Sequence, residues 1–230
     1  MNRMYDLLLQ LPIFQGLSYE QLTGIVEKIP FSFMHYAPGD VIHERGALCD
    51  GVLFVLGGTV RQTTPTFGGR IRIVQDFTGP HTLPFYYLFG AENRSNSELM
   101  AIDQVGMMHV EKGCFLRMIQ QNSIMLVNVL NMLSTHAQKQ HVAMEFTGLS
   151  DPVLRLSSWL LAFTDRKSSQ TTVEAAEDAW LSLLRLDAPS FWRCVAVLEG
   201  RECVEIEKGI LKLTDRYALR RFVGEKTLAK

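Results

Sequence analysis

The sequence of 230 residues lacks several features that would place it in a familiar class. Its four cysteines, Cys49, Cys114, Cys194 and Cys203, form no CxxC pair and have no histidine at metal-ligand spacing, so neither a disulfide scaffold nor a zinc site is expected. No apolar run approaches the length of a transmembrane helix, and Pro12 interrupts the short apolar stretch near the N-terminus. We therefore expect a cytoplasmic protein with reduced thiols and no membrane partner.

The motifs of common enzyme classes are also missing. The sequence has no phosphate-binding glycine loop of the Walker or Rossmann type, no HExxH and no GxSxG. Its glycine pairs, Gly57-Gly58 and Gly68-Gly69, are accounted for by turns between strands. We do not expect an enzyme.

A large charge imbalance is absent as well. The formal net charge is −1, from 23 basic and 24 acidic residues, so any contact with nucleic acid must come from a local patch. Basic residues are in modest excess over residues 178–230. The length and the hydrophobic content of 47% are enough for two domains with cores of their own.

Short β-like runs fill the sequence between Pro30 and His109. They are separated by turn residues such as Pro38-Gly39-Asp40 and Gly46. The predicted strands cover residues 31–36, 41–44, 51–56, 59–63, 70–77 and 99–110. Many short strands at regular spacing predict a sandwich or a jelly-roll barrel.

A long helix is predicted next, from a cap at Ser123 to about Phe146. One apolar seam recurs at intervals of four and three residues, as in a coiled coil, and would pack against a second copy of the chain. The seam residues are Leu126, Leu130, Leu133, Ala137, His141 and Met144. Met125, Val129 and Met132 are available for the barrel side, and the alternative is that the seam itself packs against its own barrel.

The last third of the chain has the layout of a winged helix-turn-helix. Gly148 and Asp151-Pro152 indicate a hinge, and a helix over 153–164 and a polar linker over 165–172 follow. A further helix ends near Leu186, and Asp187 can cap the next one, which carries Pro189 in its first turn. A hairpin of strands 204–206 and 210–213, turned by residues 207–209, forms the wing. In this layout the second helix of the pair enters the DNA major groove.

Together these segments resemble the CRP/FNR family of bacterial transcription regulators. The resemblance spans about residues 11–219 and is carried by LPIFQGLSYEQL, YAPGDVIHERG and DGVLFVLGGTV in the first half. In the second half it is carried by the frame of Asp187, Ser190, Phe191, Arg193, Leu198-Glu199 and residues 215–219.

The resemblance implies an α+β protein of three parts. These are an N-terminal double-stranded β-helix (jelly-roll) sensor domain over residues 1–121, a dimerisation helix over 122–149 and a C-terminal winged helix domain over 150–230. It further implies a homodimer that binds double-stranded DNA and a small-molecule effector. RNA polymerase is a further candidate partner.

The resemblance also places the DNA contacts, with two departures. Ala188 stands where the family has its first base-reading arginine, and Trp192 stands at a small polar position. An arginine there discriminates guanine by about 1–3 kcal/mol, which alanine cannot supply. The candidate DNA-binding residues are Ser190, Arg193, Trp192, Arg185, Lys208 and Lys212. The alternative is a sensor or protein-interaction module of the same fold that has lost specific DNA binding.

The implied effector pocket departs further from the family. Cyclic-nucleotide-binding members carry a Gly-Glu pair for the ribose and an Arg-Ser or Arg-Thr pair for the phosphate. Pro84-Phe85 and Asn96-Ser97 stand at those positions, and Arg94-Ser95 lies two residues early. A buried phosphate would lack its charge partner, so cyclic AMP is not expected.

The pocket would instead be apolar and aromatic, suited to a hydrophobic small molecule or simply a filled core. Its candidate residues are Leu83, Pro84, Phe85, Tyr86, Tyr87, Arg94, Ser95, Asn96 and Ser97. Haem is an alternative cofactor, because other sensors of the family use metals. Its candidate axial ligands are His81, His109, His136, His141 and Met144.

Overall fold

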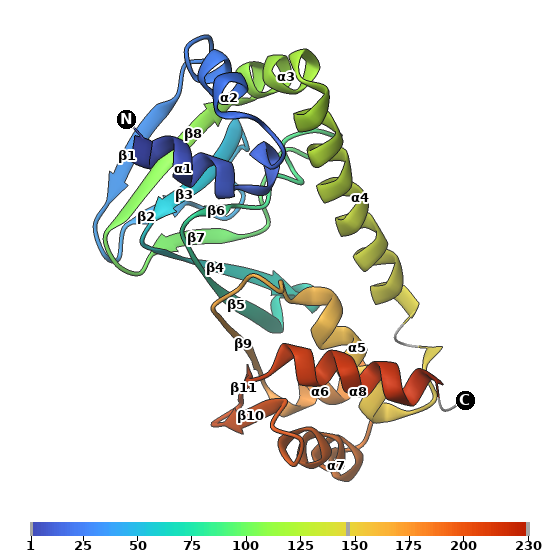
Figure 1. Cartoon of the computed structure of the whole chain (residues 1–230). Coiled ribbons are helices and arrows are strands. Elements are labelled where there is room, and N and C mark those ends of the chain that lie inside the picture. The colour runs from blue at the N-terminus through green and yellow to red at the C-terminus, as the bar shows by residue number, and fades with distance from the viewer. Residues whose placement is uncertain (1, 146–147, 229–230) are drawn as a thin grey trace. The chain divides into compact units, whose positions relative to one another are not determined.

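A computed structural model describes residues 2–145 and 148–228. The chain forms two compact units, one made of residues 1–61 and 77–136 and the other of residues 62–76 and 137–230 (Figure 1). The class is α+β, as predicted, with a β-sandwich in the first unit and mainly helices in the second. The expected domain boundaries after residues 121 and 149 stay predictions.

The first unit opens with three short helices: α1 (Asn2–Gln10), the 3-10 helix η1 (Pro12–Phe14) and α2 (Tyr19–Val26). The predicted capping box begins α2: the Ser18 hydroxyl accepts from the backbone of Gln21 at 3.2 Å, and the Gln21 side chain accepts from the backbone of Ser18 at 2.9 Å. Leu11, Ile13 and Phe14 are completely buried, so these helices cover the core.

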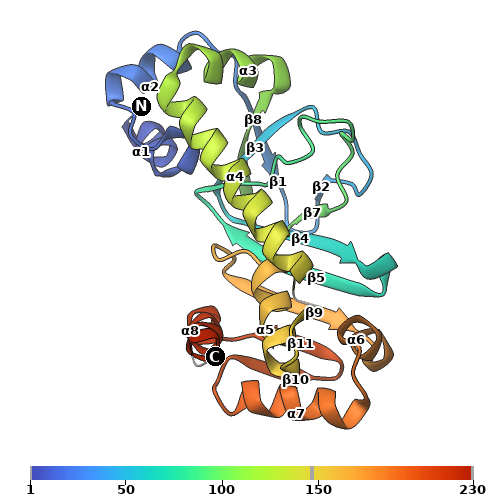
Figure 2. The same cartoon turned by 90° about the vertical axis from the view of Figure 1, so that its right-hand side faces the viewer.

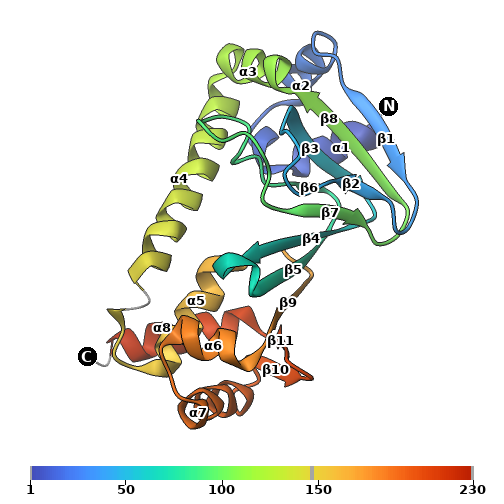
Figure 3. The same cartoon turned by 180° about the vertical axis from the view of Figure 1, so that it is seen from behind.

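The β-sandwich has two faces. One sheet has the order β1 (Ser32–Tyr36), β8 (Val105–Glu111), β3 (Gly51–Gly57), β6 (His81–Thr82). The other face has β7 (Glu98–Ala101), with β2 (Val41–His43) on one side and the start of β4 (Thr59–Thr66) on the other. Figure 3 shows β7 and β2 in front of β3 and β8.

One predicted strand is wrong in its extent. Residues 99–110 form not one strand but two, β7 and β8, because the chain turns between Ala101 and Val105. The Asp103 carboxylate holds this turn by accepting from the backbone of Thr59 at 2.7 Å. The two-residue strand β6 was not predicted, since it is too short to show any alternation.

Helices α3 (Lys112–Gln121) and α4 (Ser123–Glu145) follow the sandwich. The predicted cap at Ser123 is wrong by one residue: the Asn122 side chain accepts from the backbone of Ile124 at 3.0 Å and of Met125 at 3.1 Å. Met125 and Val129 are buried in the core of the first unit and Met132 packs against it, which confirms the predicted barrel-facing side. The expected end of the helix at Phe146 lies outside the described residues.

The second unit contains the predicted winged helix layout. Its elements are α5 (Pro152–Phe163), β9 (Gln170–Ala175), α6 (Glu177–Leu184), α7 (Ala188–Glu199), β10 (Val204–Glu207), β11 (Ile210–Leu213) and α8 (Arg216–Leu228). Lys208 and Gly209 connect β10 to β11 with φ of +51° and +81°, a two-residue turn that matches the twist of a hairpin. Figure 2 shows this hairpin beside α7.

The prediction of a polar linker over residues 165–172 is wrong for the last three residues, which belong to a strand. β9 begins at Gln170 and lies between β11 and β5 (Ile71–Thr78). Both edges of β9 are paired and Thr171 and Val173 are buried, so this β-branched segment is a central strand.

A hairpin tip that is remote in sequence completes the second unit. The end of β4, the 3-10 helix η2 (Phe67–Gly69) and β5 reach this unit, where Ile71 to Asp76 pair with Ala175 to Gln170. Ile71 and Ile73 are buried in its core with Trp159 and Trp180. None of the described helices is both long enough and apolar enough to cross a membrane.

Candidate functional site

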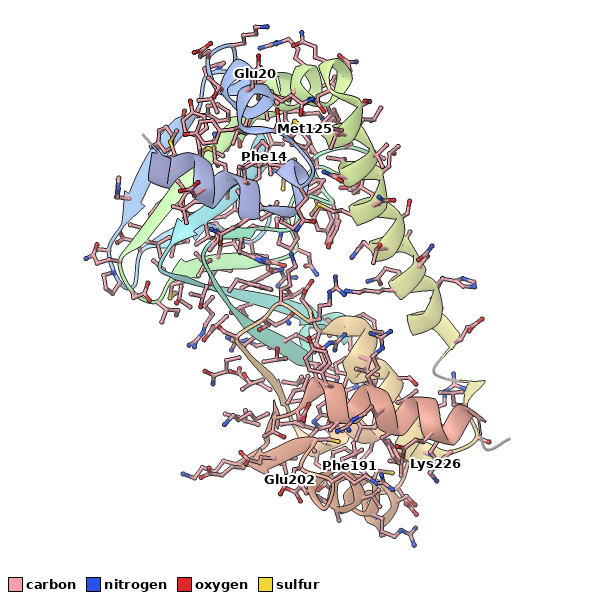
Figure 4. All side chains as sticks on the ribbon, viewed as in Figure 1. Phe14, Glu20, Met125, Phe191, Glu202 and Lys226 are labelled. Atoms are coloured by element: carbon pink, nitrogen blue, oxygen red, sulfur yellow. The ribbon has the colours of Figure 1, made fainter. Side chains whose placement is uncertain are left out.

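Helix α7 is the centre of the candidate DNA-binding surface. Asp187 caps it, since its carboxylate accepts from the backbone of Ser190 at 2.9 Å. Hydrogen bonds from the side chain and backbone of Ser190 hold the pKa of Asp187 below its usual value. Cys194 and Leu198 are buried on the inner side of the helix, as is Phe191, which Figure 4 labels.

The opposite face of α7 is open to solvent. It carries Pro189, Trp192, Arg193, Ala196 and Val197, all of them exposed. Trp192 is 42% exposed and Val197 is 43% exposed, so this face combines one cation with several apolar groups. α7 lies at the edge of its unit in all three cartoon views (Figures 1–3).

The structure brings three predicted DNA contacts together on α7. The guanidinium of Arg193 donates to the Ser190 hydroxyl at 2.9 Å, so these two side chains form one polar group. The indole Nε1 of Trp192 donates to a carboxylate oxygen of Glu177 at 2.9 Å. Glu177 lies in the first turn of α6 and was missed by the sequence analysis, because no local pattern links it to Trp192.

The other predicted DNA contacts flank this helix. Arg185 is exposed at the C-terminal end of α6, in the left-handed conformation with φ of +53°. In the wing, Lys208 lies 3.5 Å from Glu207 and Lys212 lies 3.7 Å from Glu205. Both ion pairs are largely exposed, and such pairs are worth about 0–1 kcal/mol, so phosphate could displace the glutamates.

A second group of cations lies on α8 and the loop before β9. Arg216 is anchored by donating to Thr164 Oγ1 at 2.6 Å and to the Leu161 carbonyl at 2.7 Å. Burial lowers the pKa of Arg216; the negative charge of Asp165 opposes this shift, and the positive charges of Arg220 and Arg166 add to it with smaller effects. The basic residue 220, one helical turn from residue 216, and its neighbour 221 were the available sequence signal for this group.

The predicted effector residues occupy different environments. Leu83 and Phe85 are buried in two separate core clusters, and Phe85 meets Phe115 edge-on at 5.7 Å. Tyr87 is half-buried, whereas Pro84 is exposed. At Leu83 and Phe85 the filled-core interpretation therefore fits better than an open pocket.

The polar members of the predicted pocket are engaged locally. Arg94 is exposed and donates to the Gly46 carbonyl at 2.9 Å. The Ser95 hydroxyl donates to the Ser97 carbonyl and accepts from its backbone N–H, both at 3.1 Å, and Asn96 is half-buried between them. These contacts shape the loop between β6 and β7.

The predicted dimer seam on α4 is mostly exposed. Leu130 is 52% exposed, Leu126, Ala137 and Met144 are also exposed, and only Leu133 packs partly against the core of the first unit. An apolar row on the surface of a helix is typical of an interface.

The candidate haem ligands mostly have protein partners. His81 is buried and stacks on Phe77 at 4.6 Å, and His136 stacks on Tyr86 at 3.5 Å between ring centroids. His109 lies 3.3 Å from the Asp50 carboxylate, and the exposed His141 lies 3.7 Å from Glu145, one helical turn further along α4. Met144 is exposed. Over residues 2–145 and 148–228, no group of three or more histidine, cysteine or acidic side chains is placed to hold a metal ion.

Comparison with known proteins identifies the fold. No protein-family model and no curated protein sequence matches the chain. Among solved structures, the catabolite activator protein of Thermus thermophilus matches with a TM-score of 0.54 and 15% identity, over 93% of this chain and 99% of that one. The transcriptional regulator DNR from Pseudomonas aeruginosa matches with a TM-score of 0.45 and 18% identity, over 94% of this chain and 96% of that one. A transcription regulator of the CRP/FNR family from Eubacterium rectale matches with a TM-score of 0.47 and 15% identity, over 93% of this chain and 98% of that one. The likeness to the Thermus protein shows that this chain has the fold of a catabolite activator protein.

Proposed function

We propose that this chain is a transcription regulator of the CRP/FNR type that acts in the cytoplasm as an effector-responsive homodimer and binds duplex DNA through α7 and the wing. The observation that carries the proposal is the open face of α7, which is capped by Asp187 and flanked by the β10–β11 hairpin, in a chain with the fold of a catabolite activator protein. A helix held this way can enter the major groove while the hairpin contacts the adjacent backbone.

The polar groups of this surface suit phosphate better than bases. Ser190 and Arg193 form one hydrogen-bonded group on α7, and Arg185 at the end of α6 and Lys208 and Lys212 in the wing are exposed. Phosphate contacts set position and affinity, whereas base contacts set specificity. Binding that depends on these cations weakens steeply with salt.

The exposed seam on α4 supports the homodimer. Leu126 and Leu130 lie one turn apart on the helix surface, and burying them against a second copy would remove apolar groups from water. Two copies of α7 in one dimer would then reach successive major grooves, about 34–36 Å apart.

The effector acts in this proposal by binding one dimer arrangement better than another. Cyclic AMP does not fit, because Pro84 and Phe85 stand where a ribose-binding acid is needed and Phe85 fills the core. An apolar small molecule near the aromatic residues Tyr86 and Tyr87 fits better, and RNA polymerase is the proposed partner of the DNA-bound dimer.

A selection experiment tests the proposal. The full-length protein is incubated with sheared DNA of its own genome, and bound fragments are recovered and titrated at two salt concentrations. We expect enriched fragments whose affinity falls with salt and falls further in Arg193→Ala, whereas the exposed control Arg45→Ala in the first unit binds normally. Failure to enrich any fragment, with or without cell extract as a source of effector, would contradict DNA binding.

A second candidate function is a sensor or protein-interaction module that no longer reads DNA. The exposed Trp192 and Val197 favour it, because large apolar groups on an open helix face are typical of protein contacts. It predicts that Arg193→Ala leaves function intact, while changes at Phe85, Tyr86 or Tyr87 abolish it.

A further inference from the structure

The polar side chains on and beside the open face of α7 are largely occupied by contacts within the protein. The Ser190 hydroxyl accepts from Arg193, and the indole N–H of Trp192 donates to Glu177. At the end of the helix the Glu199 carboxylate accepts from the backbone of Ile206 in the wing at 3.2 Å. Few hydrogen-bonding groups are left to read base edges, and Arg193 is the main one.

Trp192 is held by contacts on both α6 and α7. The bond from Nε1 to Glu177 fixes one edge of the indole at 2.9 Å, and Phe191 meets the ring edge-on with 5.3 Å between centroids. The residue is still 42% exposed. This exposed surface is therefore mainly apolar, and its position is set before any partner binds.

Val197 extends the apolar surface along the helix. It lies one turn beyond Arg193 and is 43% exposed, and the exposed Ala196 lies one turn beyond Trp192. With Pro189 in the first turn, the apolar groups run along the whole outward face. Ala188 adds no donor to it.

The major groove offers only one apolar group to such a surface. Among the base edges exposed there, thymine alone carries a methyl group, at C5, and the others present hydrogen-bond donors and acceptors. We infer that α7 reads its DNA site mainly through contacts of Trp192 and Val197 with thymine methyl groups, with Arg193 supplying a guanine or phosphate contact from the same helix. The inference rests on the proposed function and names the feature of the duplex that is read.

The test replaces thymine by deoxyuridine, which removes the methyl group and leaves the hydrogen bonds unchanged. Duplexes recovered by selection are resynthesised with deoxyuridine at each thymine in turn and titrated by fluorescence anisotropy. Burial of one methyl group corresponds to a factor of about four in affinity, so two contacted thymines give about fifteenfold. We expect losses of about fourfold for single substitutions at a few positions in each half-site, and about fifteenfold when two such positions are substituted together.

Two variants assign the effect to α7. Trp192→Ala and Val197→Thr should each lose the preference for thymine over deoxyuridine at a subset of the sensitive positions. Tyr217→Ala, which truncates an aromatic side chain that is 72% exposed on α8, should keep the full preference. The emission of the buried Trp159 and Trp180 checks that Trp192→Ala is folded.

The outcomes separate the two proposals. Equal affinity of the wild-type protein for thymine and deoxyuridine duplexes overturns the inference and leaves the proposed function standing. Binding to no duplex overturns the proposed function and the inference together. A thymine preference that persists in both Trp192→Ala and Val197→Thr also overturns the inference, because the methyl groups would then be read by another element.

Discussion

Ile71 is predicted to stabilise the second unit although it lies in a hairpin far from that unit in sequence. The side chain is completely buried in the core that contains Trp159, Trp180 and Phe191. In Ile71→Ala three carbon atoms lose their contacts and leave a cavity, and such changes cost about 2–5 kcal/mol in the free energy of unfolding. With a slope of about 1.5 kcal/mol per molar urea, a loss of about 3 kcal/mol lowers the midpoint by about 2 M.

The tryptophans make the assay specific to this unit. Trp159, Trp180 and Trp192, the three in the sequence, all belong to the second unit, so their emission during urea unfolding reports on that unit alone. Arg72→Ala is the matched control on the same strand: its ion pair to Glu174 is 3.4 Å long and exposed, so its loss costs less than about 1 kcal/mol. An unchanged midpoint in Ile71→Ala would refute the packing of the hairpin into this core.

Three further predictions concern the dimer, a turn and a helix cap. Leu130→Glu should convert the dimer to a monomer in sedimentation velocity, because a carboxylate replaces an apolar group on the proposed seam; an unchanged dimer would exclude this seam. Gly58→Ala should lower the melting temperature in circular dichroism more than Gly68→Ala: both glycines have positive φ, but only at Gly58 would the new Cβ meet a backbone oxygen, that of Gln104, at 2.3 Å. The Asp187 carboxylate, whose pKa is lowered, should stabilise α7 fully above its usual pKa of 3.8 and lose this effect as the pH falls through the lowered value. Wild type should therefore lose melting temperature more steeply than Asp187→Asn under acidic conditions, and parallel curves would contradict the cap.

Local signals in the sequence were sufficient for most elements of the fold. Ser18 and Asp187 cap the predicted helices, and the turn at Lys208-Gly209 joins the predicted wing strands. These features depend on residues within four positions of one another, where backbone hydrogen bonding dominates. The capping residue of α4 was missed by one position, since Asn122 and Ser123 are both good caps and only the backbone conformation decides between them.

Features that depend on distant partners could not be predicted from the sequence. The predicted linker includes the first three residues of β9, because polar residues such as Thr172 give no local sign of a strand that is stabilised by pairing with β5 and β11. The hydrogen bond of Trp192 to Glu177 joins two helices and has no local signature. The same limit applies to Phe85, whose aromatic ring suits a pocket or a core equally well until its neighbours are known.

The most direct test of the central claim, that the open face of α7 meets DNA, is the fluorescence of Trp192. Trp159 and Trp180 are about 1% exposed, so a duplex that covers α7 can change only the emission of Trp192, which is 42% exposed. We predict that a selected duplex shifts or quenches the emission and reduces its quenching by acrylamide in the wild-type protein, and that Trp192→Phe shows neither effect while still binding. Binding of a duplex that leaves the emission and the acrylamide quenching of the wild-type protein unchanged would contradict the account.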